Sequence, residues 1–206
     1  LEKFHETYGF YPQYPVADAG YGSYNNYIYC EQHGMKKYMK FTMFKKETTD
    51  KKYRDNPFRA VNFKIDEEGT LRCPAGKAFH FQYRRNVKGN QYGRQEEIYQ
   101  CEDCTECPYA AQCKKTDKKR TIQLNHELTS MHQEVVENLE SIHGALLRMN
   151  RSIQSEGTFG ILKNNRWYKR IVRKGMEQVR LEIFLVSIGY NLYKYYNKTL
   201  RIKKAA

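Results

Sequence analysis

Four cysteines within a short stretch constrain this chain more than any other feature of its sequence. Cys101, Cys104, Cys107 and Cys113 follow the pattern C-x2-C-x2-C-x5-C, and Cys73 lies upstream in an Arg-Cys-Pro sequence. Such spacings require tight turns, and turns of this kind place thiolates around one metal ion at about 2.3 Å. A closed four-thiolate site is structural and stabilises a block that is too small to fold by itself.

More cysteines are available here than a structural metal site needs. We expect Zn²⁺, with Cys101 as the spare thiol and four ligands in Cys73, Cys104, Cys107 and Cys113. An iron–sulfur cluster is an alternative, because C-x2-C-x2-C is also a cluster spacing, although the ferredoxin run has three residues before its fourth cysteine. A metal-free or disulfide role is the third possibility, and Cys30 is expected to be simply buried.

The chain divides into three blocks of different character. Residues 1–45 predict a strand–helix–strand unit, in which a glycine-rich turn follows an apolar run, Ser23 can cap the helix and Gly34 can end it. Residues 46–125 hold short strand-like pieces and the cysteine cluster, and are typical of an insert with its own small core. Residues 126–206 are predicted to be helical.

Two apolar patterns define the helices of the last block. One stripe, spaced by three or four positions, indicates a single amphipathic helix; it comprises Leu128, Met131, Val135, Leu139, Ile142, Leu146 and Met149. A second helix, over about residues 177–196, is apolar on several faces, so we expect it to be sandwiched in the core.

The chain is basic, with a formal net charge of +13 that is concentrated at its carboxyl end. Residues 151–206 contain thirteen Lys or Arg and three Asp or Glu. A positive field of this kind attracts polyanions, most commonly nucleic acid, although a solubilising surface is the alternative. No apolar stretch approaches the roughly 18 residues of a membrane-spanning helix, so an integral membrane protein is excluded.

Two acidic residues are candidates for chemistry. Asp18 follows an apolar strand and precedes Gly-Tyr-Gly, at the strand end where α/β proteins carry their active sites. Extending the apolar stripe leads to Ile153 and then Glu156, so Glu156 is expected on the buried helix face, where an unpaired carboxylate needs a cation. We therefore consider a divalent metal ion shared by Asp18 and Glu156. A turn aspartate, and a glutamate paired with Lys or Arg, are the structural alternatives.

The same residues resemble a known family. Val16 to Ser23 resembles the second-aspartate motif of insertion-sequence DDE transposases, and Arg151 to Lys163 resembles their glutamate helix, where a lysine follows the glutamate after six residues. Arg170, the Arg173-Lys174-Gly175 run and Asn191 are similar to the family's trailing pattern. The cysteine-rich insert looks like that of one subgroup of these transposases.

The resemblance implies an α/β fold: an RNase H-like partial sheet with a small β, cysteine-rich zinc-binding insert and a helical C-terminal part. It implies DNA strand cleavage and transfer with Mg²⁺ or Mn²⁺, with Asp18 as the second acid of the family's triad and Glu156 as the third. It also implies a homo-oligomer on DNA, with transposon ends and target as partners. The residues expected to contact DNA, rather than form a solvated helix face, are Arg151, Lys163, Arg166, Lys169, Arg170, Arg173 and Lys174.

The chain departs from the family pattern at two points. The family's arginine, separated from the glutamate by three residues, would fall at Ser152, whereas this chain has Arg151 and no evident tyrosine partner. The first aspartate should precede Asp18, but the acids there are Glu2 and Glu6. We therefore expect the C-terminal part of a transposase, inactive by itself in a plasmid-nicking assay.

Two other functions fit parts of the sequence. One is a zinc-stabilised, basic nucleic-acid-binding module without catalysis, in which Asp18 and Glu156 are structural. The other is a nuclease of the same fold that does not transpose. Reduced cysteines and the family resemblance favour a bacterial protein of the cytoplasm, associated with the nucleoid.

Overall fold

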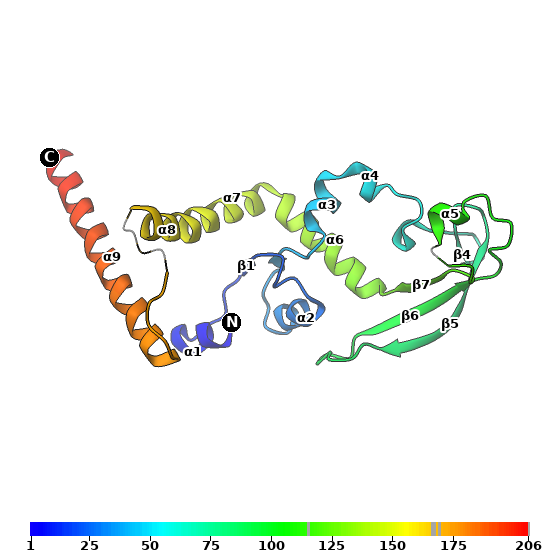
Figure 1. The fold of residues 1–206 in the computed structure, drawn as a ribbon, viewed down its shortest axis with the longest axis horizontal. Helices are drawn as coiled ribbons and strands as arrows, with labels where there is room; N and C mark the ends of the chain where they lie inside the picture. Colours follow the sequence, from blue (N-terminus) through cyan, green and yellow to red (C-terminus); the bar gives the residue numbers. More distant parts are fainter. Residues whose placement is uncertain (115, 166–167, 169, 206) are drawn as a thin grey trace. The chain divides into compact units, whose positions relative to one another are not determined.

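The computed structural model describes residues 1–114, 116–165, 168 and 170–205 and has a mixed α/β fold (Figure 1). The chain forms two compact units, Leu1–Leu147 and Arg148–Ala206. Within the described residues, every helix is too short or too polar to cross a lipid bilayer.

All of the described strands lie in the first unit. Its elements, in chain order, are α1 (Glu2–Tyr8), β1 (Val16–Ala17), α2 (Tyr24–Gln32), β2 (Tyr38–Met39), α3 (Phe44–Thr49), α4 (Lys51–Arg54), the 3₁₀ turn η1 (Ala60–Asn62), β3 (Lys64–Ile65), β4 (Leu71–Arg72), β5 (Ala78–Asn86), β6 (Gln95–Cys101), α5 (Ala110–Cys113), β7 (Thr121–Leu124) and α6 (His126–Glu140). Helix α7 (Ile142–Arg151) begins in this unit and runs into the second. The second unit continues with η2 (Ser152–Glu156), α8 (Gly157–Gly160), η3 (Ile161–Asn165) and α9 (Met176–Ala205).

The first strands form the predicted β–α–β unit. Strands β1 and β2 pair in parallel, with Ala17 opposite Met39, and α2 connects them. Ser23 caps α2, because its hydroxyl accepts a hydrogen bond from the backbone N–H of Asn26. Gly34 follows the helix with φ of 65°, a left-handed conformation that glycine adopts without steric cost.

A first core packs α6 against this unit. Its fully buried members include Tyr27, Cys30, Val135 and Leu139, which confirms that Cys30 is a packing residue. One charged side chain, Lys37, is buried with them, and its ammonium group lies 2.5 Å from carboxylate oxygens of both Glu31 and Glu134. These two acids raise the pKa of Lys37 against the opposing effect of burial, so the lysine stays charged.

A five-stranded antiparallel sheet forms the second core of the unit. Its strand order is β3-β4-β5-β6-β7, and the β5–β6 hairpin extends well beyond the other strands (Figure 1). The buried apolar side chains at its base are Phe63, Leu71, Phe79, Cys101, Ile122 and Leu124. The sequence predicts strands over residues 60–65, 70–73, 78–84 and 97–101, and strands β4, β5 and β6 lie at the last three of these ranges. In the first range, residues 60–62 form a 3₁₀ turn and the strand is confined to β3.

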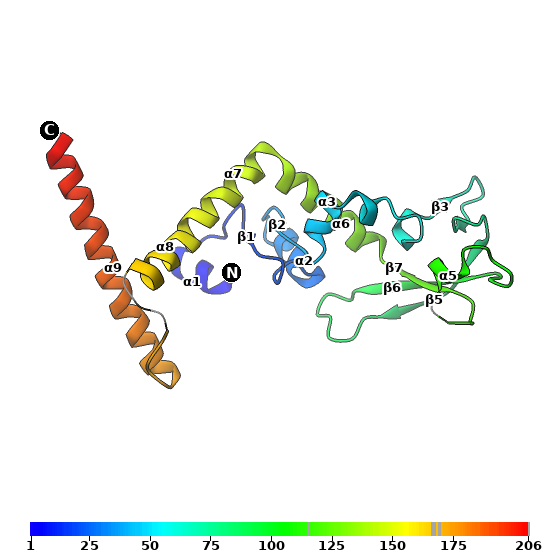
Figure 2. The same cartoon turned by 45° about the horizontal axis from the view of Figure 1, so that its top comes forward.

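The expected single amphipathic helix is broken at Ser141, where the backbone is extended (Figure 2). In α6 the stripe is buried as expected, but beyond the break Ile142 is 85% exposed and Met149 is 52% exposed. The Ser141 hydroxyl accepts a hydrogen bond from the backbone N–H of Gly144 and so starts α7. The prediction of one continuous buried stripe is therefore wrong in its second half.

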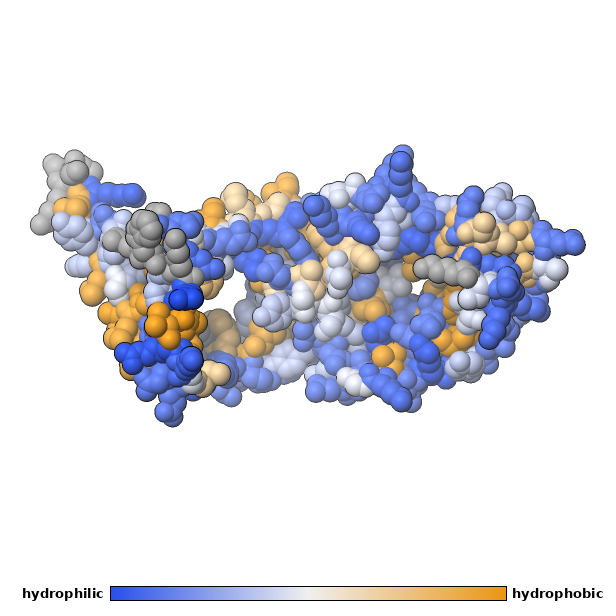
Figure 3. Space-filling view, in the orientation of Figure 1, coloured by the Kyte–Doolittle hydropathy of each residue, from blue (hydrophilic) through white to orange (hydrophobic). Residues whose placement is uncertain are grey.

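Helix α9 also differs from expectation. It is longer than predicted, and its apolar side chains are exposed rather than sandwiched, as the orange atoms in Figure 3 illustrate. Phe184 is 62% exposed and Leu192 is 64% exposed. Within the second unit, the Tyr190 hydroxyl lies 3.5 Å from that of Thr158 in α8. Most of the described apolar side chains of α9 are therefore exposed.

Candidate active site and cysteine cluster

Asp18 lies at the carboxyl end of β1, as the sequence predicts. Its backbone carbonyl accepts a hydrogen bond from Tyr21, which closes a tight turn, and the Tyr21 carbonyl accepts one from the amide side chain of Asn26 in α2. The Lys40 backbone N–H donates to the carbonyl of Ala17, one residue before Asp18. The acid is therefore held between the strand pair and the first turn of α2.

Gly22 packs this turn closely against the backbone of Lys40, the residue that follows β2. A Cβ atom at this position would lie 2.1 Å from the carbonyl oxygen of Lys40 and 2.6 Å from the Tyr27 hydroxyl. That hydroxyl donates a 2.9 Å hydrogen bond to the carbonyl of Met39 in β2. Glycine is required here for close approach of two backbones, and not for a positive φ.

Glu156 ends the first of two π-helical turns in the second unit. Its carboxylate accepts a 2.9 Å hydrogen bond from the Ser152 hydroxyl. Both Glu156 and the neighbouring Ile153 are exposed, so the expectation that Glu156 lies on a buried helix face is wrong. The cause is the break at Ser141, which ends the buried stripe before it reaches Glu156. π-Helical turns occur frequently at functional sites.

Asp18 belongs to the first unit and Glu156 to the second. Both provide the oxygen ligands that Mg²⁺ prefers. Within the described residues, no three His, Cys, Asp or Glu side chains are placed to share one metal ion. A site shared by these two acids therefore stays a prediction.

The basic residues predicted to contact DNA lie along the second unit. Lys163 is exposed on the second π-helical segment, and Arg170 and Lys174 are exposed in the loop before α9. Arg173 is also exposed in that loop and hydrogen-bonds through its guanidinium to Gln178, at 3.4 Å. Arg151, at the end of α7, is partly buried. Arg166 and Lys169 lie outside the described residues.

Glu182 of α9 organises this loop, and sequence reasoning missed it. Its carboxylate accepts hydrogen bonds from the Tyr168 hydroxyl at 2.6 Å, the Val172 backbone N–H at 3.0 Å and the Arg173 backbone N–H at 2.8 Å. The Tyr168 hydrogen bond and the two amides lower the pKa of Glu182. The sequence signal for Glu182 was its position as one of three acids in the strongly basic segment 151–206.

The five clustered thiols lie at the base of the antiparallel sheet. Burial, together with the neighbouring Cys104 thiol, raises the pKa of Cys101 to about 12. Arg120 hydrogen-bonds to two of the thiols. Its backbone N–H donates to the Cys104 sulfur at 3.4 Å, and its guanidinium donates to the Cys113 sulfur at 2.7 Å. Cys101 thus packs beside a proposed ligand rather than apart from the cluster.

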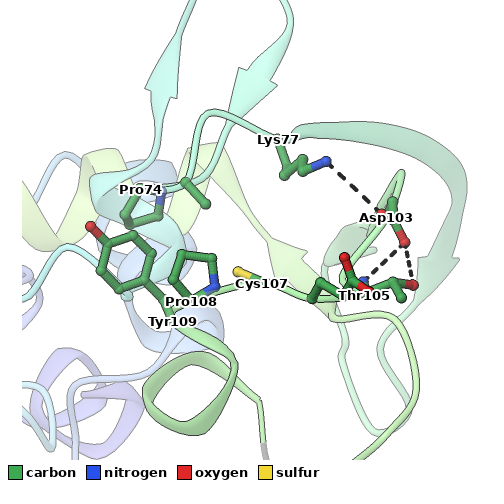
Figure 4. Close-up of a pocket in the computed structure, with 9 residues that line it drawn as sticks. Pro74, Lys77, Asp103, Thr105, Cys107, Pro108 and Tyr109 are labelled. Carbon is green, nitrogen blue, oxygen red and sulfur yellow. Dashed lines mark hydrogen bonds and ion pairs between the residues drawn. The ribbon is translucent and has the colours of Figure 1, made fainter.

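Cys107 lines an open pocket of about 680 Å³ beside the cluster (Figure 4). The pocket lies between the Cys73–Gly76 turn and the Cys104–Cys107 turn, and an ion pair between Lys77 and Asp103 borders it at 3.9 Å. Glu106 has φ of 52°, an uncommon conformation for a residue other than glycine. The turns at Cys73 and at Cys104–Cys107 are as expected, whereas Cys101 ends β6 and Cys113 ends α5. No three of these thiols, all of which lie in the described part of the chain, are placed to share one metal ion.

The transposase DDE domain family matches residues 72–196, which is well over half of the chain. This chain belongs to the transposase DDE domain family. The match includes the cysteine cluster, Glu156 and Lys163, and it begins after Asp18. Neither a curated protein nor a solved structure matches the chain. The mixed α/β architecture, with its curled antiparallel sheet and C-terminal helix, is consistent with the RNase H-like fold expected of a transposase DDE domain.

Proposed function

We propose that this transposase DDE domain takes part in metal-dependent DNA strand cleavage and transfer during transposition. The observation that carries the proposal is the family match across the segment that contains Glu156. The position of Asp18, at the carboxyl end of a parallel strand, supports it further. DNA is the partner that the family implies, with transposon ends and target as its substrates.

The two acids have the same proposed role, which is to hold divalent ions beside the scissile phosphodiester. When bound, Mg²⁺ or Mn²⁺ would activate the attacking hydroxyl and stabilise the leaving oxygen. The chain's own contribution is positional: Gly22 and the Tyr21 turn fix Asp18, and the Ser152 hydroxyl orients Glu156. We assign the first acid of the family's triad to no residue of this chain, and we propose that these 206 residues alone do not nick DNA.

Metal-dependent stability distinguishes this proposal from a non-catalytic binding module. Divalent ions that bind the folded state raise its melting temperature by mass action. We expect millimolar Mg²⁺ to stabilise the chain, and Glu156→Gln to abolish this increase. Glu177→Gln is the matched control, because it removes an exposed acid from the same unit. An equal Mg²⁺ effect in the wild type and in Glu156→Gln would favour the binding module.

The basic residues of the second unit are proposed to hold the DNA backbone. They are Arg151, Lys163, Arg166, Lys169, Arg170, Arg173 and Lys174. Each phosphate that such a residue neutralises releases counterions and adds about 0.9 to the slope of log K against log salt for duplex DNA. Replacing Arg173 and Lys174 together by glutamine should flatten that slope by up to roughly two. An unchanged slope in fluorescence-anisotropy titrations would remove this pair from the interface.

We propose a structural zinc ion for the cysteine-rich segment, with Cys73, Cys104, Cys107 and Cys113 as ligands. The donor set supports this proposal, because closely spaced thiols are typical of closed zinc sites. Cys73, Cys104 and Cys107 lie on two tight turns and Cys113 ends α5, so ion binding would have to draw the thiols together. Protein purified without chelator should contain about one zinc per chain by elemental analysis. Cys104→Ser should lose the zinc, whereas Cys30→Ser should retain it. Iron in place of zinc would support the cluster alternative.

The remaining proposals concern organisation and setting. We propose that residues 1–45 and 126–206 together form the RNase H-like domain and that residues 46–125 form its insert. We also propose a homo-oligomer on DNA and a bacterial, cytoplasmic, nucleoid-associated protein. These proposals rest on the family's chemistry.

A further inference from the structure

The loop between η3 and α9 carries Arg170, Arg173 and Lys174, yet an acidic side chain holds its backbone. Both carboxylate oxygens of Glu182 are used: one accepts from the Tyr168 hydroxyl and the Val172 amide, and the other from the Arg173 amide. Carboxylates that accept hydrogen bonds of this kind form shorter and stronger contacts than neutral acceptors do. Glu182 is therefore a three-point clamp on the basic loop.

Electrostatics alone would not place an acid here. A negative charge beside a phosphate-binding loop weakens long-range attraction for DNA, so a surface built only for charge would lack Glu182. The geometry offers a reason for its presence. By accepting two successive backbone amides, it fixes the chain at Val172 and Arg173, directly before Lys174 and the left-handed Gly175.

We infer that Glu182 is a positioning residue for DNA binding, which pre-orders the loop so that Arg173 and Lys174 meet phosphate groups without a further ordering cost. This inference rests on the proposed DNA-binding role of the loop. Pre-ordering increases affinity because the loss of conformational freedom occurs before binding rather than during it. The inference predicts that loss of an acid will weaken binding to a polyanion, the opposite of the simple charge effect.

The test compares two acids of the same helix. Glu177 lies in the first turn of α9 and is exposed, and its carboxylate makes no hydrogen bond or ion pair with another described residue. Glu177→Ala should therefore bind a DNA duplex as tightly as the wild type, or more tightly. Glu182→Ala should bind about three- to tenfold more weakly, because hydrogen bonds to a charged group are lost. Glu182→Gln keeps acceptor oxygen but not the charge, and should be intermediate.

Two further measurements separate positioning from general stability. Hydrogen exchange of the Val172 and Arg173 amides in DNA-free protein should accelerate in Glu182→Ala, with no change in the core amides of α6. Arg173→Gln should weaken DNA binding in the wild type but have little effect in the Glu182→Ala background. The reason is that Arg173 contributes to binding only while Glu182 holds the loop backbone, so the two substitutions remove the same contribution.

The outcomes distinguish the inference from the proposal beneath it. If the Arg173 and Lys174 pair variant binds DNA as the wild type does, both the DNA-binding loop and the inference are wrong. If that pair matters but Glu182→Ala binds as tightly as Glu177→Ala, only the inference is overturned. Should Glu182→Ala fail to fold, Glu182→Gln decides the question by the same comparison.

Discussion

Gly22→Ala should destabilise the first unit and displace the turn that carries Asp18. The added Cβ would meet the Lys40 carbonyl oxygen at 2.1 Å. Lys40 directly follows β2 and its backbone N–H is bonded to the Ala17 carbonyl, so this backbone oxygen cannot rotate aside as a side chain would. Overpacking of this kind costs about 1–3 kcal/mol, and more where backbone must move. For a chain of this length, we expect a melting temperature lower by roughly 3–10 °C in a thermal scan.

Gly20→Ala is the matched control, because it lies in the same turn and a Cβ there meets nothing within 4 Å. Its stability should stay within about 0.5 kcal/mol of the wild type. Equal losses from the two substitutions would show that the effect comes from glycine flexibility in the turn. The close packing of Gly22 on the Lys40 backbone would then not be what holds Asp18.

Leu139→Ala should cause the largest loss of stability among simple truncations of α6. Leu139 is fully buried in the first core, and removing a buried leucine costs about 2–5 kcal/mol, depending on how far the cavity collapses. Chemical denaturation should show this loss as a lower midpoint with an unchanged slope.

Ile142→Ala separates two descriptions of the same sequence. Leu139 and Ile142 belong to one apolar stripe at helical spacing, so a continuous helix would bury both side chains. In the structure Ile142 is 85% exposed, so its truncation should change stability by less than about 0.5 kcal/mol. A loss comparable to that of Leu139→Ala would contradict the break at Ser141.

The β–α–β unit around Asp18 could be predicted because its signals are local. A capping serine, a glycine stop and short apolar runs each specify one element boundary, and the structure has all of them. The strand positions of the antiparallel sheet were predictable for the same reason. The packing of Gly22 on Lys40 was not, because it depends on a contact between segments 18 residues apart.

The helical block shows where periodicity stops being informative. The stripe is regular through Met149, but the side chain of Ser141 caps a new helix and Gly144 packs on the preceding turn, where a Cβ would lie 2.1 Å from the Asn138 carbonyl oxygen. A side-chain cap and a glycine contact can interrupt a helix without altering its apolar spacing. The same interruption explains why Glu156 is exposed rather than buried.

The clamp made by Glu182 illustrates a different limit. Composition identified the basic loop, since its cationic residues follow one another closely in the sequence. An acid within this basic segment is unusual, but the pattern does not indicate that Glu182, in the second turn of the next helix, binds the loop backbone. This contact depends on how the chain reverses at Gly175, which is a property of the folded backbone and not of the residue pattern.

We propose that Asp18 and Glu156 bind one divalent ion between them. The most direct test is a double-mutant cycle on Mn²⁺ affinity, measured by electron paramagnetic resonance of the free ion, with Asp18→Asn, Glu156→Gln and the double variant. We predict that each single substitution weakens binding and that the double variant is scarcely weaker than either, since ligands of one ion are strongly coupled. Strictly additive effects, or a Glu156→Gln variant with unchanged affinity, would contradict the shared site.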